Sequence, residues 1–129
     1  MSTHRLAPIV VAVAIAVLVV AIAPSAGAKD GDVRVRGTCT AASTVKLKLS
    51  DEDGRLEIEL EVDQNRNGVR WKVVLRRNGK VVRRAAPVTR APSGSFTLRR
   101  VIANAPGVDR VVAVATSPAR ERCVARASF

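Results

Sequence analysis

Three glutamates at alternate positions are the residues whose type and spacing come closest to an active site. Glu57, Glu59 and Glu61 stand between apolar residues in an unbroken alternation over 56–62, which is typical of a half-buried antiparallel strand. Successive side chains on one strand face lie about 6.5 to 7 Å apart, a carboxyl separation that suits an inverting glycosidase. The alternative is that these glutamates form ion pairs with basic residues on neighbouring strands.

Basic residues stand at matching positions on both sides of this stretch. Turns at 51–54 and 64–67 would bring the flanking strands alongside it and place basic side chains opposite the glutamates. The expected pairs are Lys48–Glu57, Lys46–Glu59, Lys72–Glu59 and Arg70–Glu61. Such neighbours hold a carboxylate in its charged form, whereas a general acid needs a raised pKa. We therefore interpret the glutamates as ion-pair partners that fix the strand register.

Other catalytic side chains are scarce. Beyond residue 28 the chain has no histidine and no tyrosine, and we expect its two cysteines to be oxidised. Triads that join a serine or a cysteine to a histidine are therefore excluded. We predict no catalytic residues, no cofactor and no enzymatic activity.

The stretch 63–68 matches the first half of a calcium-binding loop. Asp63, Asn65 and Asn67 place oxygen atoms at alternate positions, and Gly68 permits a sharp turn. The second half does not fit, because Val74 stands where the bidentate glutamate belongs. We therefore expect a turn rich in asparagine and glycine, and no calcium (Ca2+) site.

Basic residues are concentrated in the second half of the chain. Residues 29–63 carry six basic and nine acidic side chains, whereas 64–129 carry fifteen basic and two acidic ones. Several of these cations surround Asn78-Gly79, a dipeptide that favours a type I′ hairpin turn. The residues of this basic hairpin are Arg76, Arg77, Lys80, Arg83 and Arg84. Such a cluster attracts anionic polymers through long-range electrostatics and counter-ion release.

Two functions fit this composition. The first is a non-catalytic binding module that associates with an anionic cell-envelope polymer through the basic hairpin. The second is a protein-partner module, inhibitor-like or adhesin-like, that uses the loop 87–94 or an exposed strand edge to bind an extracellular protein. Nucleic acid is disfavoured as a partner, since one tryptophan and two phenylalanines provide no platform for stacking bases. A basic surface that only keeps the protein soluble is the alternative to both.

The first 28 residues have the pattern of a secretory signal peptide. A polar start precedes the apolar run 9–23, and Ala26-Gly27-Ala28 provides the small residues that a signal peptidase recognises. We predict cleavage after Ala28, which leaves 29–129 as a single secreted, extracellular β domain without a membrane span. An anchor that is not cleaved is the alternative, although a span usually needs about 20 apolar residues.

The two cysteines lie near the two ends of this β domain. In an exported chain, Cys39 and Cys123 favour a disulfide over a metal site, which needs more ligands. Closing this long loop constrains the unfolded chain and contributes on the order of 4 to 5 kcal/mol in the chain-entropy description.

The elements that would position these residues are short strands. Apolar residues alternate with polar ones, turn signals recur about every 8 to 12 residues, and helical periodicity is absent. The expected strands are 33–39, 44–50, 56–62, 69–75, 80–84, 95–102, 109–115 and 123–129. We expect 69–75 to pair with 56–62 and to point Trp71 inward, the loop 87–94 to cross between two sheets, and 109–115 to be buried on both faces.

This pattern predicts an all-β fold, an immunoglobulin-like antiparallel β-sandwich of seven or eight strands with one disulfide. A small open β-barrel is the alternative. Several short motifs together resemble small exported β-sandwich proteins of actinobacteria. These motifs are Gly37-Thr38-Cys39, Glu52-Asp53-Gly54, Val62-Asp63 through Asn67-Gly68 followed by Trp71, Asn78-Gly79, Ser93-Gly94-Ser95-Phe96 and Cys123. The resemblance extends over nearly all of 29–129 and implies secretion, a disulfide and a sandwich, but no particular activity.

Overall fold

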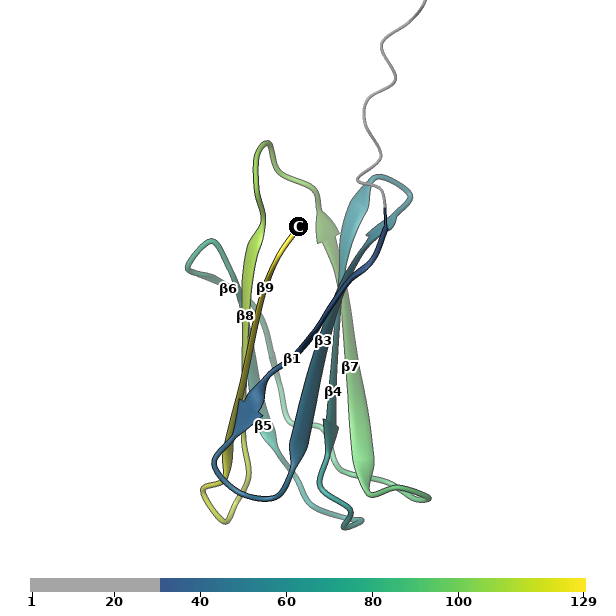
Figure 1. The fold of residues 1–129 in the computed structure, drawn as a ribbon, viewed down its shortest axis with the longest axis vertical. Coiled ribbons are helices and arrows are strands. Elements are labelled where there is room, and N and C mark those ends of the chain that lie inside the picture. The colour runs from purple at the N-terminus through teal and green to yellow at the C-terminus, as the bar shows by residue number, and fades with distance from the viewer. Residues whose placement is uncertain (1–30) are drawn as a thin grey trace, which may run out of the picture.

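Alternating apolar and polar residues form nine β-strands in the computed structural model, which describes residues 31–129 (Figure 1). The strands are β1 (Val33–Arg36), β2 (Thr38–Cys39), β3 (Thr44–Glu52), β4 (Arg55–Asp63), β5 (Lys72–Arg77), β6 (Lys80–Ala85), β7 (Ser95–Ala103), β8 (Arg110–Thr116) and β9 (Arg122–Ser128). The predicted signal peptide lies outside the described residues. Within 31–129 no helix has the length and apolar character needed to cross a membrane.

The strands form two antiparallel sheets. Sheet A has the order β1-β3-β4-β7, and sheet B has the order β2-β9-β8-β5-β6. The sheets stack as the two layers of a β-sandwich and do not close into a barrel (Figure 1). The predicted crossing at 87–94 is confirmed, because this loop carries the chain from β6 in sheet B to β7 in sheet A.

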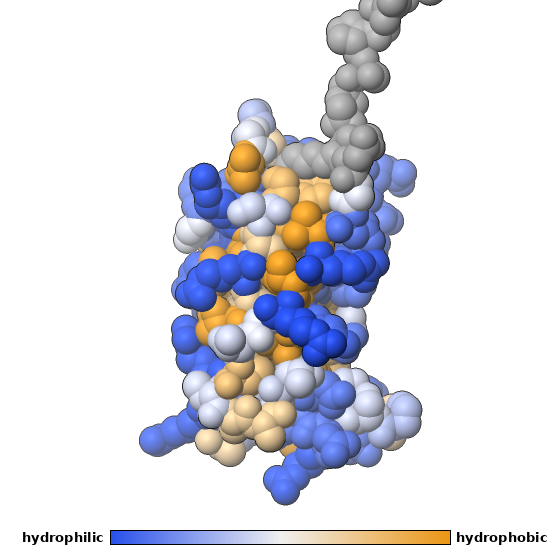
Figure 2. Space-filling view, viewed as in Figure 1, coloured by the Kyte–Doolittle hydropathy of each residue, from blue (hydrophilic) through white to orange (hydrophobic). Residues whose placement is uncertain are grey.

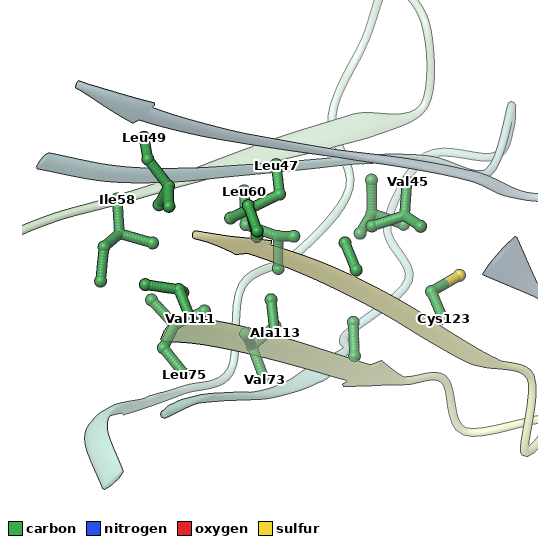
Figure 3. Close-up of a cluster of buried hydrophobic side chains, with 14 of the residues drawn as sticks. Val45, Leu47, Leu49, Ile58, Leu60, Val73, Leu75, Val111, Ala113 and Cys123 are labelled. Atoms are coloured by element: carbon green, nitrogen blue, oxygen red, sulfur yellow. The ribbon is translucent and has the colours of Figure 1, made fainter. Parts of the chain in front are cut away.

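The core lies between the two sheets and is made of alternate residues from each (Figure 3). Leu47, Leu49, Ile58 and Leu60 of sheet A meet Val73, Leu75, Val111 and Ala113 of sheet B, and all of these side chains are buried. Trp71 is fully buried, as predicted, with its ring centroid 6.2 Å from that of Phe96. Burying a large apolar side chain contributes about 1.5 to 3 kcal/mol, so these faces drive the sheets together.

The turn between β3 and β4 is shorter than predicted. Glu52 pairs with Arg55, which leaves only Asp53 and Gly54 in the turn, with φ angles of 51° and 76°. Positive φ at both positions is typical of a type I′ hairpin. The pairs are therefore Lys46 with Glu61 and Lys48 with Glu59, two residues away from the prediction. The prediction was right about the sheet faces because a shift of two residues preserves them.

The predicted neighbour of β4 on its other side is wrong. β4 pairs with β3 and β7, whereas β5 lies in sheet B, so Lys72 and Arg70 are not opposite the glutamates. The segment between β4 and β5 crosses to the other sheet. Hydrogen bonds from Gln64 N to Gly94 O (3.1 Å) and from Trp71 Nε1 to Gln64 Oε1 (3.1 Å) fix this crossing, and Trp71 is buried between the sheets.

The first predicted strand divides at Gly37. β1 pairs with β3 in sheet A, and β2 pairs with β9 in sheet B, so the chain changes sheets within one extended stretch (Figure 1). A Cβ atom on Gly37 would lie 2.2 Å from the carbonyl oxygen of Val124. Only glycine allows the two backbones to approach this closely, and the sheet change therefore depends on it.

The predicted disulfide is confirmed. Cys39 and Cys123 are bonded with an S–S distance of 2.01 Å, and they stand directly opposite each other on β2 and β9. The bond therefore joins two neighbouring strands of sheet B and not the two sheets.

Two further predictions concern sheet B. The turn at Asn78-Gly79 is confirmed, with φ angles of 48° and 82° and Arg77 paired with Lys80. Burial of 109–115 on both faces is wrong, because β8 alternates: Val111 and Ala113 are buried, whereas Val112 is only half-buried on the outer face. The outer face of sheet B therefore includes exposed apolar surface.

Candidate functional site

The outer face of sheet A holds the three glutamates of β4, which are Glu57, Glu59 and Glu61. Glu57 is buried, and the guanidinium of Arg99 binds it through Nε (2.5 Å to Oε2) and through a second nitrogen. The hydrogen bond to Glu57 raises the pKa of Arg99 above its ordinary value. Arg99 also lies 3.1 Å from a carboxylate oxygen of Glu52, and the ammonium of Lys48 lies 3.7 Å from Glu57. Cations therefore surround the most buried glutamate.

Two further ion pairs lie on this face. Lys46 Nζ lies 3.1 Å from Glu61 Oε1, and Arg34 lies 2.8 Å from Asp32. Among the described residues Glu59 has no recorded ion pair, although β3 places Lys48 and β7 places Arg99 directly opposite it. The arrangement favours the interpretation of the glutamates as ion-pair partners on a face of balanced charge.

The segment with the calcium-loop pattern forms a tight connection between the sheets. Asp63 Oδ1 accepts a hydrogen bond from Asn65 N (2.9 Å), and Asn65 has a φ of 58°. Asn65 and Asn67 are exposed, and in residues 31–129 no three His, Cys, Asp or Glu side chains lie close enough to hold a metal ion. Asp63 therefore shapes the turn, and the expectation of no bound calcium stays a prediction.

The loop 87–94 is anchored through Thr89. Thr89 is buried, and its hydroxyl donates to Arg66 O (2.6 Å) and accepts from Val69 N (3.0 Å). A Cβ on Gly94 would lie 2.2 Å from the backbone nitrogen of Arg66, so the two crossing segments pack tightly together. The loop is thus part of the framework at this end of the sandwich, with an exposed tip at 91–93.

Arg77 points away from the other cations of the basic hairpin. Its Nη1 donates a hydrogen bond of 2.6 Å to Ala103 O of sheet A, and its Nε lies 3.8 Å from Oδ1 of the buried Asp109. These contacts use the guanidinium to join β5 to the end of β7. Arg77 therefore stabilises the fold and is poorly placed to bind a partner.

The other four cations of the hairpin lie on different parts of sheet B. Arg76 pairs with Val112 and Arg84 pairs with Val74, both on the outer face of the sheet. Lys80 and Arg83 are exposed at the edge formed by β6, where a bulge interrupts the register after Leu75. The structure therefore divides the cluster that the sequence placed together.

A larger group of cations gathers on the outer face of sheet B. The register places Arg76, Val112 and Arg126 in one row across the sheet, and Lys72, Thr116 and Arg122 in another. We call this surface the cationic face. Its basic residues are Lys72, Arg76, Arg84, Arg110, Arg122 and Arg126, and its apolar residues are Val74, Val112, Val114 and Val124. None of these six cations forms a salt bridge within the described part of the chain.

In the described part of the chain the cationic face carries no acidic residue, because the acids of this half of the sequence are buried elsewhere. Only two acids, Asp109 and Glu121, occur in 64–129, and both are buried. Glu121 accepts hydrogen bonds from the backbone nitrogen of Ser43 (3.0 Å) and from its hydroxyl, which joins the loops before β3 and β9. Sheet A presents balanced charges, whereas the cationic face presents a single sign.

Sequence reasoning missed four members of the cationic face. Lys72 was predicted to pair with Glu59, and three arginines far along the chain were not connected with the hairpin. These arginines are Arg110, Arg122 and Arg126. The alternation of side chains along each strand could have identified them, because each stands next to a buried residue and so points to the outer face. No family model, no curated protein and no solved structure matches the chain. The resemblance to small exported actinobacterial proteins stays a prediction.

Proposed function

We propose that the protein is a secreted, non-catalytic binding module with an immunoglobulin-like fold that associates with an anionic cell-envelope polymer through the cationic face. The observation that carries this proposal is a sheet face that, within residues 31–129, has six basic residues and no acidic residue, while both acids of 64–129 are buried.

One-sided charge distinguishes this surface from a basic composition that only confers solubility. On sheet A, Lys46 and Arg99 are paired with acidic residues. The six cations of the cationic face have no ion-pair partner among residues 31–129, and their potentials add. Neighbouring strands lie about 4.8 Å apart, so the Cα atoms of Arg76 and Arg126 are separated by about 10 Å across the sheet. A linear polymer with repeated phosphate or carboxylate groups would contact several of these cations at once.

The proposal modifies the predicted hairpin site. Arg76 and Arg84 remain in the surface, with Lys80 and Arg83 at its edge, while Arg77 is used by the fold. The secreted location is supported by the disulfide, which persists in oxidising compartments, and by the signal-peptide pattern of the first 28 residues. The immunoglobulin-like assignment is supported by two antiparallel sheets that exchange the first strand at Gly37.

The test is retention on purified cell wall and on a defined polyanion, inorganic polyphosphate, over a salt series. The face variant carries Arg76→Gln, Arg84→Gln, Arg122→Gln and Arg126→Gln. The matched control loses the same charge at exposed arginines outside the cationic face; its changes are Arg36→Gln, Arg66→Gln, Arg90→Gln and Arg100→Gln. Each neutralised contact should reduce the slope of log affinity against log salt by about one. We expect a large loss for the face variant and little change for the control; equal losses would show that net charge alone is responsible.

A further inference from the structure

The outer edge of β9 is only partly covered. β2 is its neighbour on that side but spans just two residues, which pair with Val124 and Cys123. β1, which would continue along β9, belongs to sheet A because the chain changes sheets at Gly37. Among the described residues, the stretch 125–128 of β9 therefore has a strand neighbour on one side only, and we call it the β9 edge.

Arg126 and Ser128 direct their backbone N–H and C=O groups away from β8, out of the sheet at the β9 edge. Thr40 N donates a hydrogen bond to Arg122 O (3.0 Å), which shows that the backbone groups of Arg122 point to the side of β9 on which β2 lies. Backbone groups alternate sides along a strand, so Arg126 and Ser128 face the same way. The alternate positions face β8, as the reciprocal bonds between Phe129 and Asp109 (3.0 Å each) confirm. Within 31–129 no strand pairs with the N–H and C=O groups that Arg126 and Ser128 direct outward.

An apolar groove of about 460 Å³ runs beside the β9 edge, between β9 and β1. Its lining contains valines, an alanine, a serine and two arginines. Val33 and Val35 of β1, Arg110 and Val112 of β8, and Arg126 and Ala127 of β9 are among its lining residues. Figure 2 shows apolar side chains along the middle of this face of the molecule, flanked by hydrophilic ones. The groove is a consequence of the sheet change, which moves β1 away from β9.

We infer that the β9 edge and this groove form a docking site for an extended acidic segment of a partner protein, which adds as a strand beside β9. A strand added there would hydrogen-bond with Arg126 and Ser128. Its residues opposite 125 and 127 would point into the apolar groove, and those opposite Arg126 and Ser128 would lie beside Arg126 and Arg110. The segment is therefore one in which apolar and acidic residues alternate.

The charge of the edge distinguishes this occupant from a second copy of the chain. Two β9 edges paired antiparallel over 125–128 would bring Arg126 of one copy close to Arg126 of the other. Like charges directly opposite each other are destabilising, and cations on an edge strand are a known protection against self-pairing. The site goes beyond the proposed polymer binding, because it uses the backbone of the edge and the groove, whereas the polymer contacts side chains of the cationic face.

Amide hydrogen exchange with a defined peptide tests the inference. The probe is an acetylated peptide Glu-Val-Glu-Val-Glu-Val-Glu, added to the protein as recovered from its expression host. The control peptide has the same composition in blocks, Val-Val-Val-Glu-Glu-Glu-Glu. We expect the amides of Arg126 and Ser128 to exchange rapidly in the free protein and to slow at least about tenfold with the alternating peptide only. Slow exchange of both amides without peptide would overturn the inference, since the edge would already be covered, for instance by the N-terminal segment of the same chain.

Two substitutions separate strand addition from other binding. Ser128→Pro removes the outward N–H donor and should abolish peptide binding, whereas Ser128→Ala keeps the donor and should bind as the unchanged protein does. Arg126→Glu should transfer the preference to a peptide in which lysine replaces glutamate. Equal binding by the proline and alanine variants would contradict the inference. Retention of Ser128→Pro on polyphosphate tests the polymer proposal separately, since that variant leaves every cation of the cationic face in place.

Discussion

Arg99 of β7 binds Glu57 of β4, although the sheet register places Arg99 directly opposite Glu59. The guanidinium reaches diagonally along the sheet to the buried carboxylate of Glu57. The hydroxyl of Ser50 and the ammonium of Lys48 contact the same carboxylate. Glu59, at the directly opposite position, is more exposed and has no recorded ion pair among the described residues. Two glutamates on the same strand face thus have different roles.

Replacing these two glutamates separately should give different results. Glu57→Gln weakens the contacts of Arg99 and Lys48 at a buried position, so we expect a lower urea midpoint and a lower Tm. Glu59→Gln is the matched control and should change stability little, because a half-buried carboxylate that forms no ion pair within the described residues contributes little. Urea denaturation at neutral pH measures both. Equal midpoints for the two variants would show that the ion pairs of sheet A do not stabilise the fold.

Gly37→Ala tests the change of sheets between β1 and β2. The added methyl group would stand 2.2 Å from Val124 O and 2.8 Å from Ala125 Cβ, which forces β1 and β9 apart. We expect a loss of about 2 to 3 kcal/mol in the free energy of unfolding, as for an overpacked core. Gly107→Ala is the comparison, since open space surrounds Gly107 and only its φ of 83° is unfavourable, at about 1 kcal/mol. A Gly37 variant no less stable than the Gly107 variant would contradict the packing argument.

The sequence pattern was a good guide to which side of each strand is buried, and a poor guide to which strands are neighbours. Local alternation determines the buried side, so Trp71 and the four apolar residues of 56–62 were assigned correctly. Charge matching did not identify the partner of β4, because Lys72 and Arg70 match the glutamates as well as Arg99 does. The choice depends on the crossing at 64–71, which is fixed by long-range contacts with Gly94 and Thr89.

The candidate surface shows the same limit. The hairpin cations were visible in the sequence because they lie close together in the chain. Arg122 and Arg126 join them only because β8 stands between β5 and β9, a pairing that local patterns do not determine. The β9 edge depends on a contact that is even more distant in the sequence. β9 lies at the end of the chain, and it is left uncovered because β2, which begins only after Gly37, pairs with just two of its residues.

Removal of the disulfide should destabilise the domain strongly. Cys39 and Cys123 are separated by 84 positions, and the described residues contain no free cysteine. The double change Cys39→Ala and Cys123→Ala should lower the free energy of unfolding by about 4 kcal/mol, because the unfolded chain gains the freedom of the open loop. Urea denaturation measures the change, and a thiol titration of the unchanged folded protein is its control. Reactive thiols before unfolding would contradict the bond itself.

Arg76 and Arg77 are neighbours in the sequence with opposite expected phenotypes. Arg77→Gln removes the hydrogen bond to Ala103 O and the ion pair with the buried Asp109, so we expect a loss of about 1 to 3 kcal/mol in stability. Its retention on polyphosphate should be nearly unchanged. Arg76→Gln should leave stability within about 0.5 kcal/mol, because the side chain lies on the outer face without an ion pair in the described chain, and should weaken retention in low salt. Thermal unfolding and a salt-series retention assay on the same two proteins measure both quantities. If both substitutions weakened retention equally, the division of the hairpin between fold and binding surface would be wrong.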